Sequence, residues 1–221
     1  MGAIMSQRVF VTMMDAIGPL GSGIEELTQG LLEGRSGLGM LDLFPGVGFK
    51  STAVGQAWSF DEALERCNLE LHQTHDRKVI LAVWVLERLM RQSTSLRGFD
   101  GGLFLGTSLE HFYLPLLMDM SPGGFKLETF LEEVNKAGGW DELPLLQSPL
   151  DELELLIRER YGLVGPCYIN CSACAASTQS LGHGFEMIRD GMMHRAIVGG
   201  YDSLLNPLGL GGFALLGALA P

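Results

Sequence analysis

The stretch Pro166–Ser180 reads PCYINCSACAASTQS and contains three of the four cysteines of this chain, Cys167, Cys171 and Cys174. Its first part, PCYINCS, is rich in residues that favour a β-strand. The run ACAASTQSLGHGFEMIRDG predicts a helix over Ala175–Arg189, and HRAIVGGYDS then predicts another strand. This order of strand, helix and strand indicates an α/β domain with a largely parallel sheet.

The remaining sequence continues the alternation of strands and helices. A helix is predicted over Gly23–Gly34, with Ser22 as its N-cap and Gly34 as its stop. The sequence shows no repeat or linker, so residues 1–221 are expected to form one domain. Further strands are predicted at Arg8–Met13 and Gly101–Ser108, further helices within Ser59–Gln92, Leu127–Gly138 and Pro149–Gly162, and a loop at Arg35–Ser51.

Composition narrows the class of protein. The chain has 221 residues, 47% of them hydrophobic, and a net charge of -11 without any run of basic residues. An acidic chain of this kind is not expected to bind nucleic acid or an anionic membrane. The longest apolar run, Val79–Leu86, is much shorter than a bilayer requires, so no membrane span is predicted. The N-terminus lacks the pattern of a signal peptide and the cysteines are few, which favours a reducing, cytoplasmic setting.

Three interpretations of the cysteine cluster compete. The spacing Cys-x3-Cys-x2-Cys is one with which radical S-adenosylmethionine enzymes hold an iron–sulfur cluster, but such motifs come early in a barrel, and this one comes late. Cys171 and Cys174 also match a thioredoxin-like Cys-x-x-Cys pair, without the rest of that fold. The third interpretation is that the thiols are small buried hydrophobes, which we adopt for Cys167 and Cys171.

Cys174 differs from the other cysteines in its place along the predicted helix. It falls where a strand passes into the first turn of a helix, and the unpaired N–H groups there stabilise a thiolate. The small residues around it, ACAAS, allow a substrate to approach closely. A thiolate at such a junction is suited to covalent acyl transfer, so Cys174 is the candidate nucleophile.

The segment that begins GPCYINCSACAASTQS and ends NPLGLGGFALLGALAP resembles the active-site region of β-ketoacyl-acyl-carrier-protein synthases. Shared features are Gly-Pro before the strand, Ala-Cys-Ala at the nucleophile, Ile-Arg-x-Gly at the helix end and the AIVGG strand. The opening VFVTMMDAIGPLGSGIEELTQGLLEGRSGLG is similar to the family's first strand, turn and helix, whereas Met40–Tyr161 agrees only in outline. The resemblance implies the N-terminal half of a thiolase-like fold, a layered sheet with a buried nucleophile helix. The C-terminal half is then absent from this chain.

The resemblance also implies an activity. Cys174 would take an acyl chain from a carrier thiol as a thioester, and a malonyl unit on an acyl carrier protein would lose carbon dioxide and attack it. A backbone oxyanion hole would hold the developing charge. Leu109 falls where the family places an acyl-pocket side chain. The implied partners are acyl carrier protein and a second ketosynthase-like chain, as a homodimer or heterodimer, and no metal or other cofactor is implied.

Departures from the family pattern keep an alternative open. Met13 and Asp15 replace glycines after the first strand, and Glu110 and His111 replace a Gly-Gly pair, so bulk and charge are expected to alter the pocket. The family also completes its site with two histidines from the C-terminal half. The isolated chain is therefore expected to be inactive in condensation. The alternative is a non-catalytic, ketosynthase-like subunit with a scaffolding or dimerisation role.

No local histidine is an obvious substitute for the family pair. His183 lies nine residues after Cys174, on the opposite face of the predicted helix, and is expected to be packed. His111 is the one that could reach the site through a loop. Asp202 occupies a position that we expect to be structural rather than catalytic. The other histidines, His72, His75 and His194, have charged neighbours and are expected at the surface.

Overall fold

The structure of the chain is a computed structural model, which describes residues 7–43, 49, 51–57, 76–92, 98–108, 131–132, 135–136, 138 and 150–220. Within these ranges the elements are β1 (Ile17–Gly18), β2 (Gly21–Ser22), α1 (Ile24–Leu32), β3 (Leu38–Met40), β4 (Ala53–Gly55), α3 (Arg77–Gln92), β5 (Gly102–Gly106), α6 (Glu152–Tyr161), β6 (Cys167–Asn170), the short 3₁₀ helix η5 (Ala173–Ala175), α7 (Ala176–Arg189), β7 (Ala196–Gly200) and α8 (Pro207–Leu215).

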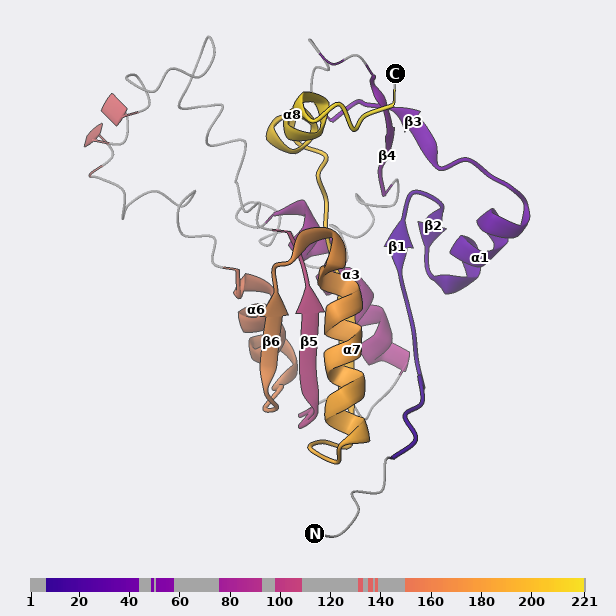
Figure 1. Cartoon of the computed structure of the whole chain (residues 1–221), viewed down its shortest axis with the longest axis vertical. Helices are drawn as coiled ribbons and strands as arrows, with labels where there is room; N and C mark the ends of the chain where they lie inside the picture. Colours follow the sequence, from indigo (N-terminus) through magenta and orange to yellow (C-terminus); the bar gives the residue numbers. More distant parts are fainter. Residues whose placement is uncertain are drawn as a thin grey trace.

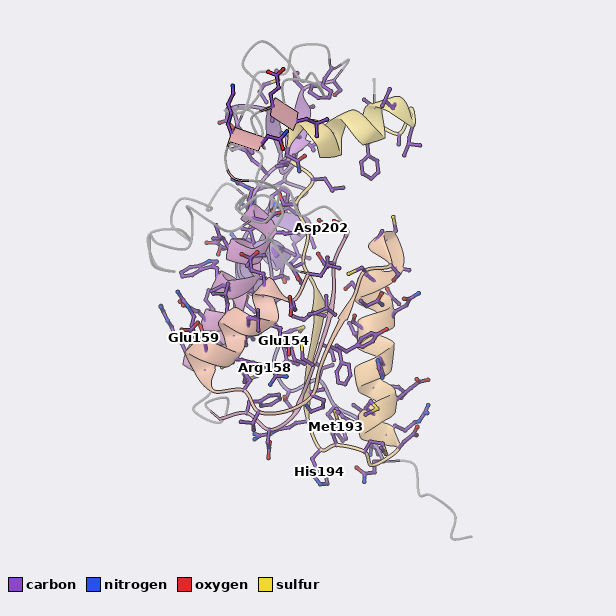
Figure 2. The ribbon with its side chains drawn as sticks, turned by 90° about the vertical axis from the view of Figure 1, so that its left-hand side faces the viewer. Glu154, Arg158, Glu159, Met193, His194 and Asp202 are labelled. Atoms are coloured by element: carbon purple, nitrogen blue, oxygen red, sulfur yellow. The ribbon has the colours of Figure 1, made fainter. Side chains whose placement is uncertain are left out.

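A parallel three-stranded sheet in the order β6-β5-β7 forms the centre of the described structure. Helix α7 lies on one face, and α3 and α6 lie on the other (Figure 1), so helices cover the sheet from both sides. In the perpendicular view of Figure 2, the strands stand between α6 and α7. This arrangement confirms the α/β class and the parallel pairing expected from the alternation of strands and helices.

The main core lies between the sheet and the two helices α3 and α6. All five residues of β5 are buried, as expected for a central parallel strand covered on both faces. Side chains on alternate positions of β5 serve the two layers: Phe104 packs toward α7, whereas Leu103 and Leu105 belong to the core on the α3 side. The other core residues include Val79, Val83, Trp84 and Leu86 of α3, and Leu153 and Ile157 of α6.

The predicted strand at Arg8–Met13 is wrong, because the structure assigns no strand there. Both long edges of β5 are occupied by β6 and β7, which leaves this segment no place beside the central strand. Its apolar residues are correspondingly exposed, with Phe10 at 66% and Val11 at 79%. The predicted loop at Arg35–Ser51 is also partly wrong, since β3 within it pairs antiparallel with β4.

Ser22 is not the N-cap of α1, contrary to the expectation from the sequence. Gly23 occupies the cap position, and no side chain caps the helix. The Ser22 hydroxyl instead accepts a hydrogen bond from Trp84 Nε1 at 3.0 Å and another from Arg88. The expected stop is confirmed, because Gly34 adopts φ +64° just after α1 and its N–H donates to Leu31 O at 3.2 Å.

The apolar run Val79–Leu86 forms part of α3, as predicted. None of the helices in the described part of the chain combines the length and the hydropathy needed to cross a bilayer. The fourth cysteine, Cys67, lies outside the described residues, as does Ser59, where the predicted helical segment begins. The same is true of other residues singled out in the sequence, namely His72, His75, Leu109, Glu110 and His111.

Candidate active site

The candidate site lies where the chain leaves β6 and turns over the edge of the sheet into α7 (Figure 1). Cys174 is the central residue of η5, and its free thiol belongs to an exposed residue. Helix α7 begins at Ala176, so the cysteine occupies a 3₁₀ turn just before the α-helix. The candidate nucleophile therefore stands at a strand–turn–helix junction, next to the positive end of a 14-residue helix.

The residue before the cysteine has an unusual backbone conformation. Ala173 has φ +50°, and it is the only non-glycine residue with positive φ among the described residues. A side chain in this left-handed region meets the backbone, so the conformation persists only where neighbouring contacts hold it. This feature gives the turn its sharp change of direction, and the amino-acid pattern gave no signal for it.

A side-chain network fixes the same turn. The Asn170 carboxamide oxygen accepts from the Ser172 N–H at 3.0 Å, while Asn170 Nδ2 donates to Gln179 Oε1 at 2.8 Å. The Ser172 hydroxyl donates to the same Gln179 oxygen at 2.6 Å. These residues were missed in the sequence. The pair Asn170 and Ser172 carried a signal, because an asparagine that accepts from the N–H two residues later forms an Asx turn.

Glycines in two strands allow the start of α7 to lie directly on the sheet. A Cβ on Gly106 of β5 would overlap the backbone of Ala176 and come within 2.5 Å of the Ser177 nitrogen. A Cβ on Gly200 of β7 would lie 2.6 Å from Ser177 Cβ. The side chains missing at these glycines leave the space that the first turn of the helix occupies.

Among the described residues, the sheet covers one face of helix α7. Its buried residues are Ala176, Ser180 and Gly184, which follow one another at intervals of four and face the sheet. Leu181 and Phe185 on its outer face are about half exposed. The nucleophile helix that the resemblance implied to be buried is therefore buried only along the face that packs on the sheet, as far as the described residues show.

Cys167 is a half-buried thiol that packs against the core, as expected. Burial, followed by a hydrogen bond with Glu154, raises its pKa to about 12. In Figure 2, Glu154 and Arg158 of α6 stand close together beside the sheet, and Arg158 Nε donates to Glu154 Oε1 at 2.7 Å. The Cys167 thiol therefore stays protonated at pH values at which a nucleophilic thiol must be ionised.

The described cysteines do not form a metal site. Cys167, Cys171 and Cys174 are all free. Within the residues that the structure describes, no three His, Cys, Asp or Glu side chains converge as metal ligands do. The three cysteines lie in different surroundings, with Cys167 in β6, Cys171 directly after it and Cys174 in η5.

The two described histidines lie away from the candidate nucleophile. The His183 ring packs against Phe104 and Tyr168, with centroid distances of 4.7 and 5.0 Å, which confirms that it is a packed residue. His194 is exposed, as predicted, and lies just before β7 at the amino end of the sheet. Figure 2 shows it at the opposite end of the sheet from Asp202, which follows the carboxyl end of β7.

Two carboxylates singled out in the sequence have structural partners. Asp202 accepts from the Ser108 hydroxyl at 3.0 Å and from the Ser203 N–H at 2.7 Å. Asp15 pairs with Arg88 of α3, which also donates to Ala16 O at 3.1 Å. The charge of Asp15 is therefore paired with Arg88 of α3, while the altered pocket that Met13 and Asp15 led us to expect stays a prediction.

Comparison with known proteins identifies the family. Residues 6–221 match the family described as beta-ketoacyl synthase, N-terminal domain. This chain belongs to the beta-ketoacyl synthase family. As a beta-ketoacyl synthase N-terminal domain, it has the thiolase-like fold that the sequence resemblance implied.

Relatives of this beta-ketoacyl synthase domain include the 3-oxoacyl-[acyl-carrier-protein] synthase 2 of Synechocystis, 25% identical over 100% of this chain and 51% of that protein. A putative polyketide beta-ketoacyl synthase 1 of Streptomyces cyaneus is 25% identical over 98% of this chain and 51% of that protein. The chain thus spans about half the length of these relatives.

Two solved structures share the fold. A type II polyketide synthase acyl-carrier protein in complex with its ketosynthase (AntDE:AntF) superposes with a TM-score of 0.65 at 23% identity, covering 97% of this chain and 50% of that chain. The ishigamide ketosynthase/chain length factor superposes with a TM-score of 0.66 at 21% identity, covering 94% and 50%.

Proposed function

We propose that this chain is the nucleophile-bearing half of a β-ketoacyl-acyl-carrier-protein synthase, in which Cys174 carries the acyl group as a thioester. The observation that supports this most directly is the exposed Cys174 thiol beside the N-terminal end of α7, in a chain of the beta-ketoacyl synthase family. An exposed thiol next to unpaired helix N–H groups is the arrangement that favours a thiolate nucleophile.

The first half-reaction is an exchange of thioesters. The Cys174 thiolate attacks the carbonyl carbon of an acyl group on a carrier protein, and the carrier thiolate leaves. Backbone N–H groups at the start of α7 would stabilise the oxyanion of the tetrahedral intermediate. The product is acyl-Cys174 and a free carrier thiol. In the second half-reaction a malonyl carrier loses carbon dioxide, its carbanion attacks the thioester, and the Cys174 thiolate leaves.

The second half-reaction needs more than the described residues offer. Decarboxylation requires donors that stabilise an enolate oxygen, and loss of one such donor typically costs about 10²–10³ in rate. His183 follows Cys174 by nine residues, about 13 Å of helix rise, and is packed on the sheet. We propose that a C-terminal ketosynthase half, not contained in this chain, supplies the missing donors. Leu109 remains the proposed acyl-pocket residue.

The alternative function is that of a non-catalytic, ketosynthase-like subunit that pairs with a second chain. The uncovered face of α7 with Leu181 and Phe185 favours association with another protein surface. One of the solved neighbours is a ketosynthase paired with a chain length factor. The two proposals differ in one measurable property, because only the enzyme half forms an acyl-cysteine.

The test is incubation of the 221-residue chain with an acyl-loaded carrier protein, followed by peptide mass mapping. We expect a thioester on Cys174 that is absent from the Cys174→Ala variant and retained in the matched Cys171→Ala variant. With malonyl carrier added, the chain alone should form no condensation product. An acyl adduct on Cys171 or Cys67 with Cys174 unmodified contradicts the proposal, and no adduct at all favours the non-catalytic subunit. Condensation by the chain alone would make His111 the first residue to replace.

A further inference from the structure

The left-handed backbone conformation of Ala173 is not explained by the neighbouring nucleophile, Cys174. A non-glycine residue at φ +50° lies in a sparsely populated region, and such residues persist when the surrounding structure over-determines them. Ala173 is exposed, so packing around its own side chain does not hold it. The constraint must come from the segments on either side of the turn.

Asn170 links the two sides of the turn. It is buried, and its main-chain oxygen accepts from the Thr107 N–H at 2.8 Å, which anchors it to the end of β5. Its side chain then contacts both segments that flank Cys174. The carboxamide oxygen holds Ser172 N on the upstream side, and Nδ2 donates to Ala176 O at 3.4 Å on the downstream side.

Gln179 closes the network from the second turn of α7. Its Oε1 accepts from Asn170 Nδ2 at 2.8 Å and from the Ser172 hydroxyl at 2.6 Å. One acceptor thus joins the strand end, the turn and the helix. Ala173 and Cys174 lie between Ser172 and Ala176. The side chains of Asn170 and Gln179, which lie outside the turn, therefore hold the backbone on both sides of these two residues.

We propose that Asn170 and Gln179 are positioning residues for Cys174, acting through the left-handed conformation of Ala173. This proposal rests on the proposed role of Cys174 as the acyl acceptor. The two carboxamides fix the backbone direction at Ala173, which sets where the next residue points its thiol and its N–H. Without them the turn relaxes to ordinary dihedral angles, and the thiol leaves its place beside the helix end.

The test measures alkylation of Cys174 by iodoacetamide as a function of pH, by mass mapping in the full 221-residue chain. We expect the Asn170→Ala variant to react about tenfold more slowly at one fixed alkaline pH, in line with the energy that such a strained conformation stores.

A second substitution separates positioning from general stability. Glycine adopts positive φ without steric cost, so Ala173→Gly should restore most of the lost rate in the Asn170→Ala background. Gln179→Glu keeps an acceptor oxygen at this position. At alkaline pH, where the alkylation rate no longer rises with pH, this variant should therefore react faster at Cys174 than Gln179→Leu. Gln179 is exposed, so its variants keep the proposal testable even where Asn170→Ala does not fold.

The matched control is Ser180→Ala. Ser180 is buried in the same turn of α7, and its hydroxyl has no hydrogen-bond partner in the described structure. Its loss should leave Cys174 alkylation within twofold of the unsubstituted chain. The proposal is overturned if Asn170→Ala and Gln179→Leu both leave the rate of Cys174 alkylation unchanged, or if Ala173→Gly restores nothing. Failure of the carrier-protein assay alone would refute acyl transfer while leaving this alkylation cycle informative.

Discussion

Gly106 of β5 lies directly beneath Ala176, the first residue of α7, at a separation that leaves no room for a side chain. Because Gly106 has no side chain, the N-terminal end of α7, next to Cys174, packs directly against the sheet. The atoms that a Cβ on Gly106 would meet belong to the backbone of Ala176 and Ser177. A change of side-chain rotamer therefore cannot relieve the overlap.

Substitution of Gly106 by alanine should displace the start of α7. The added Cβ meets the backbone of Ala176 and Ser177, and overpacking of this kind typically lowers the free energy of unfolding by about 1–3 kcal/mol. Denaturant unfolding gives this value, and iodoacetamide labelling should show slower reaction at Cys174. The matched control is Gly199→Ala in β7, where a Cβ would meet nothing within 4 Å. Equal stability of the two variants would contradict the close seating.

Loss of Arg88 should be costly because its partner is buried. The Arg88 and Asp15 side chains are only 16% and 4% exposed, and Arg88→Met leaves the carboxylate without its guanidinium. Breaking a buried pair from one side typically costs about 3–5 kcal/mol, and the neutral double variant Asp15→Asn, Arg88→Met should recover much of that loss.

The control for this ion pair is Arg91→Met, four residues after Glu87 on the same helix. Arg91 is 60% exposed and its pair with Glu87 is 3.5 Å long, so its loss should cost about 0–1 kcal/mol. Chemical denaturation of the four proteins measures all three differences. If Arg88→Met and Arg91→Met cost the same, the Asp15–Arg88 pair does not anchor the N-terminal segment.

Alkaline pH should lower the free energy of unfolding. The reason is that Cys167 and Tyr161 stay protonated in the folded chain at pH values at which they ionise in the unfolded chain. Burial raises the pKa of Cys167 from 9.0 to about 12, and burial also raises the pKa of Tyr161 from 10.0 to about 12. Between pH 9 and 12 the unfolded state therefore binds fewer protons than the native state, and stability falls as pH rises. Their contribution is fully present below pH 9.

Urea unfolding at a series of alkaline pH values measures this decline. The Cys167→Ala variant should lose stability less steeply with pH than the unsubstituted chain, whatever its stability at neutral pH. Cys171→Ala serves as the comparison, since Cys171 is also a half-buried free thiol. An identical slope in the Cys167→Ala variant would show that Cys167 ionises normally in the folded chain.

The exposed end of α8 should promote self-association. Leu215 and Leu216 are 92% and 78% exposed at the end of a glycine-rich apolar segment, and exposed apolar patches drive association. The Leu215→Lys, Leu216→Lys double variant should stay monodisperse at concentrations where the unsubstituted chain forms larger species. Light scattering over a concentration series checks this. The control is Glu33→Lys at the C-cap of α1, an exposed position where the substitution changes the net charge by the same amount. Monodisperse behaviour of the unsubstituted chain would contradict the prediction.

The elements that the sequence predicted well are those with a local signal. The apolar run Val79–Leu86 predicted part of α3, and the β-favouring residues of PCYINCS and AIVGG predicted the two strands that flank β5. The position of Cys174 before a helix was predicted for the same reason, because a strand, a turn and a helix follow one another within about 25 residues.

What the sequence could not provide depends on distant partners. Ser22 has the composition of an N-cap, yet its hydroxyl binds Trp84, 62 positions later, and Asp15 binds Arg88, 73 positions later. Arg8–Met13 has the composition of a strand but no free edge beside β5. At the site, alanine has no tendency toward positive φ, so the conformation of Ala173 follows from its surroundings and not from its identity.

The central position of β5 has a consequence for the order in which the protein can fold during synthesis. Its partners, β6 and β7, both come later in the chain, and residues 107–166 must be made before the first of them appears. At typical synthesis rates of about 5–20 residues per second, the apolar strand β5 remains without its partner strands for about 3–12 s. Folding of this domain therefore depends on contacts distant in sequence, which slows folding and leaves apolar surface exposed on the growing chain.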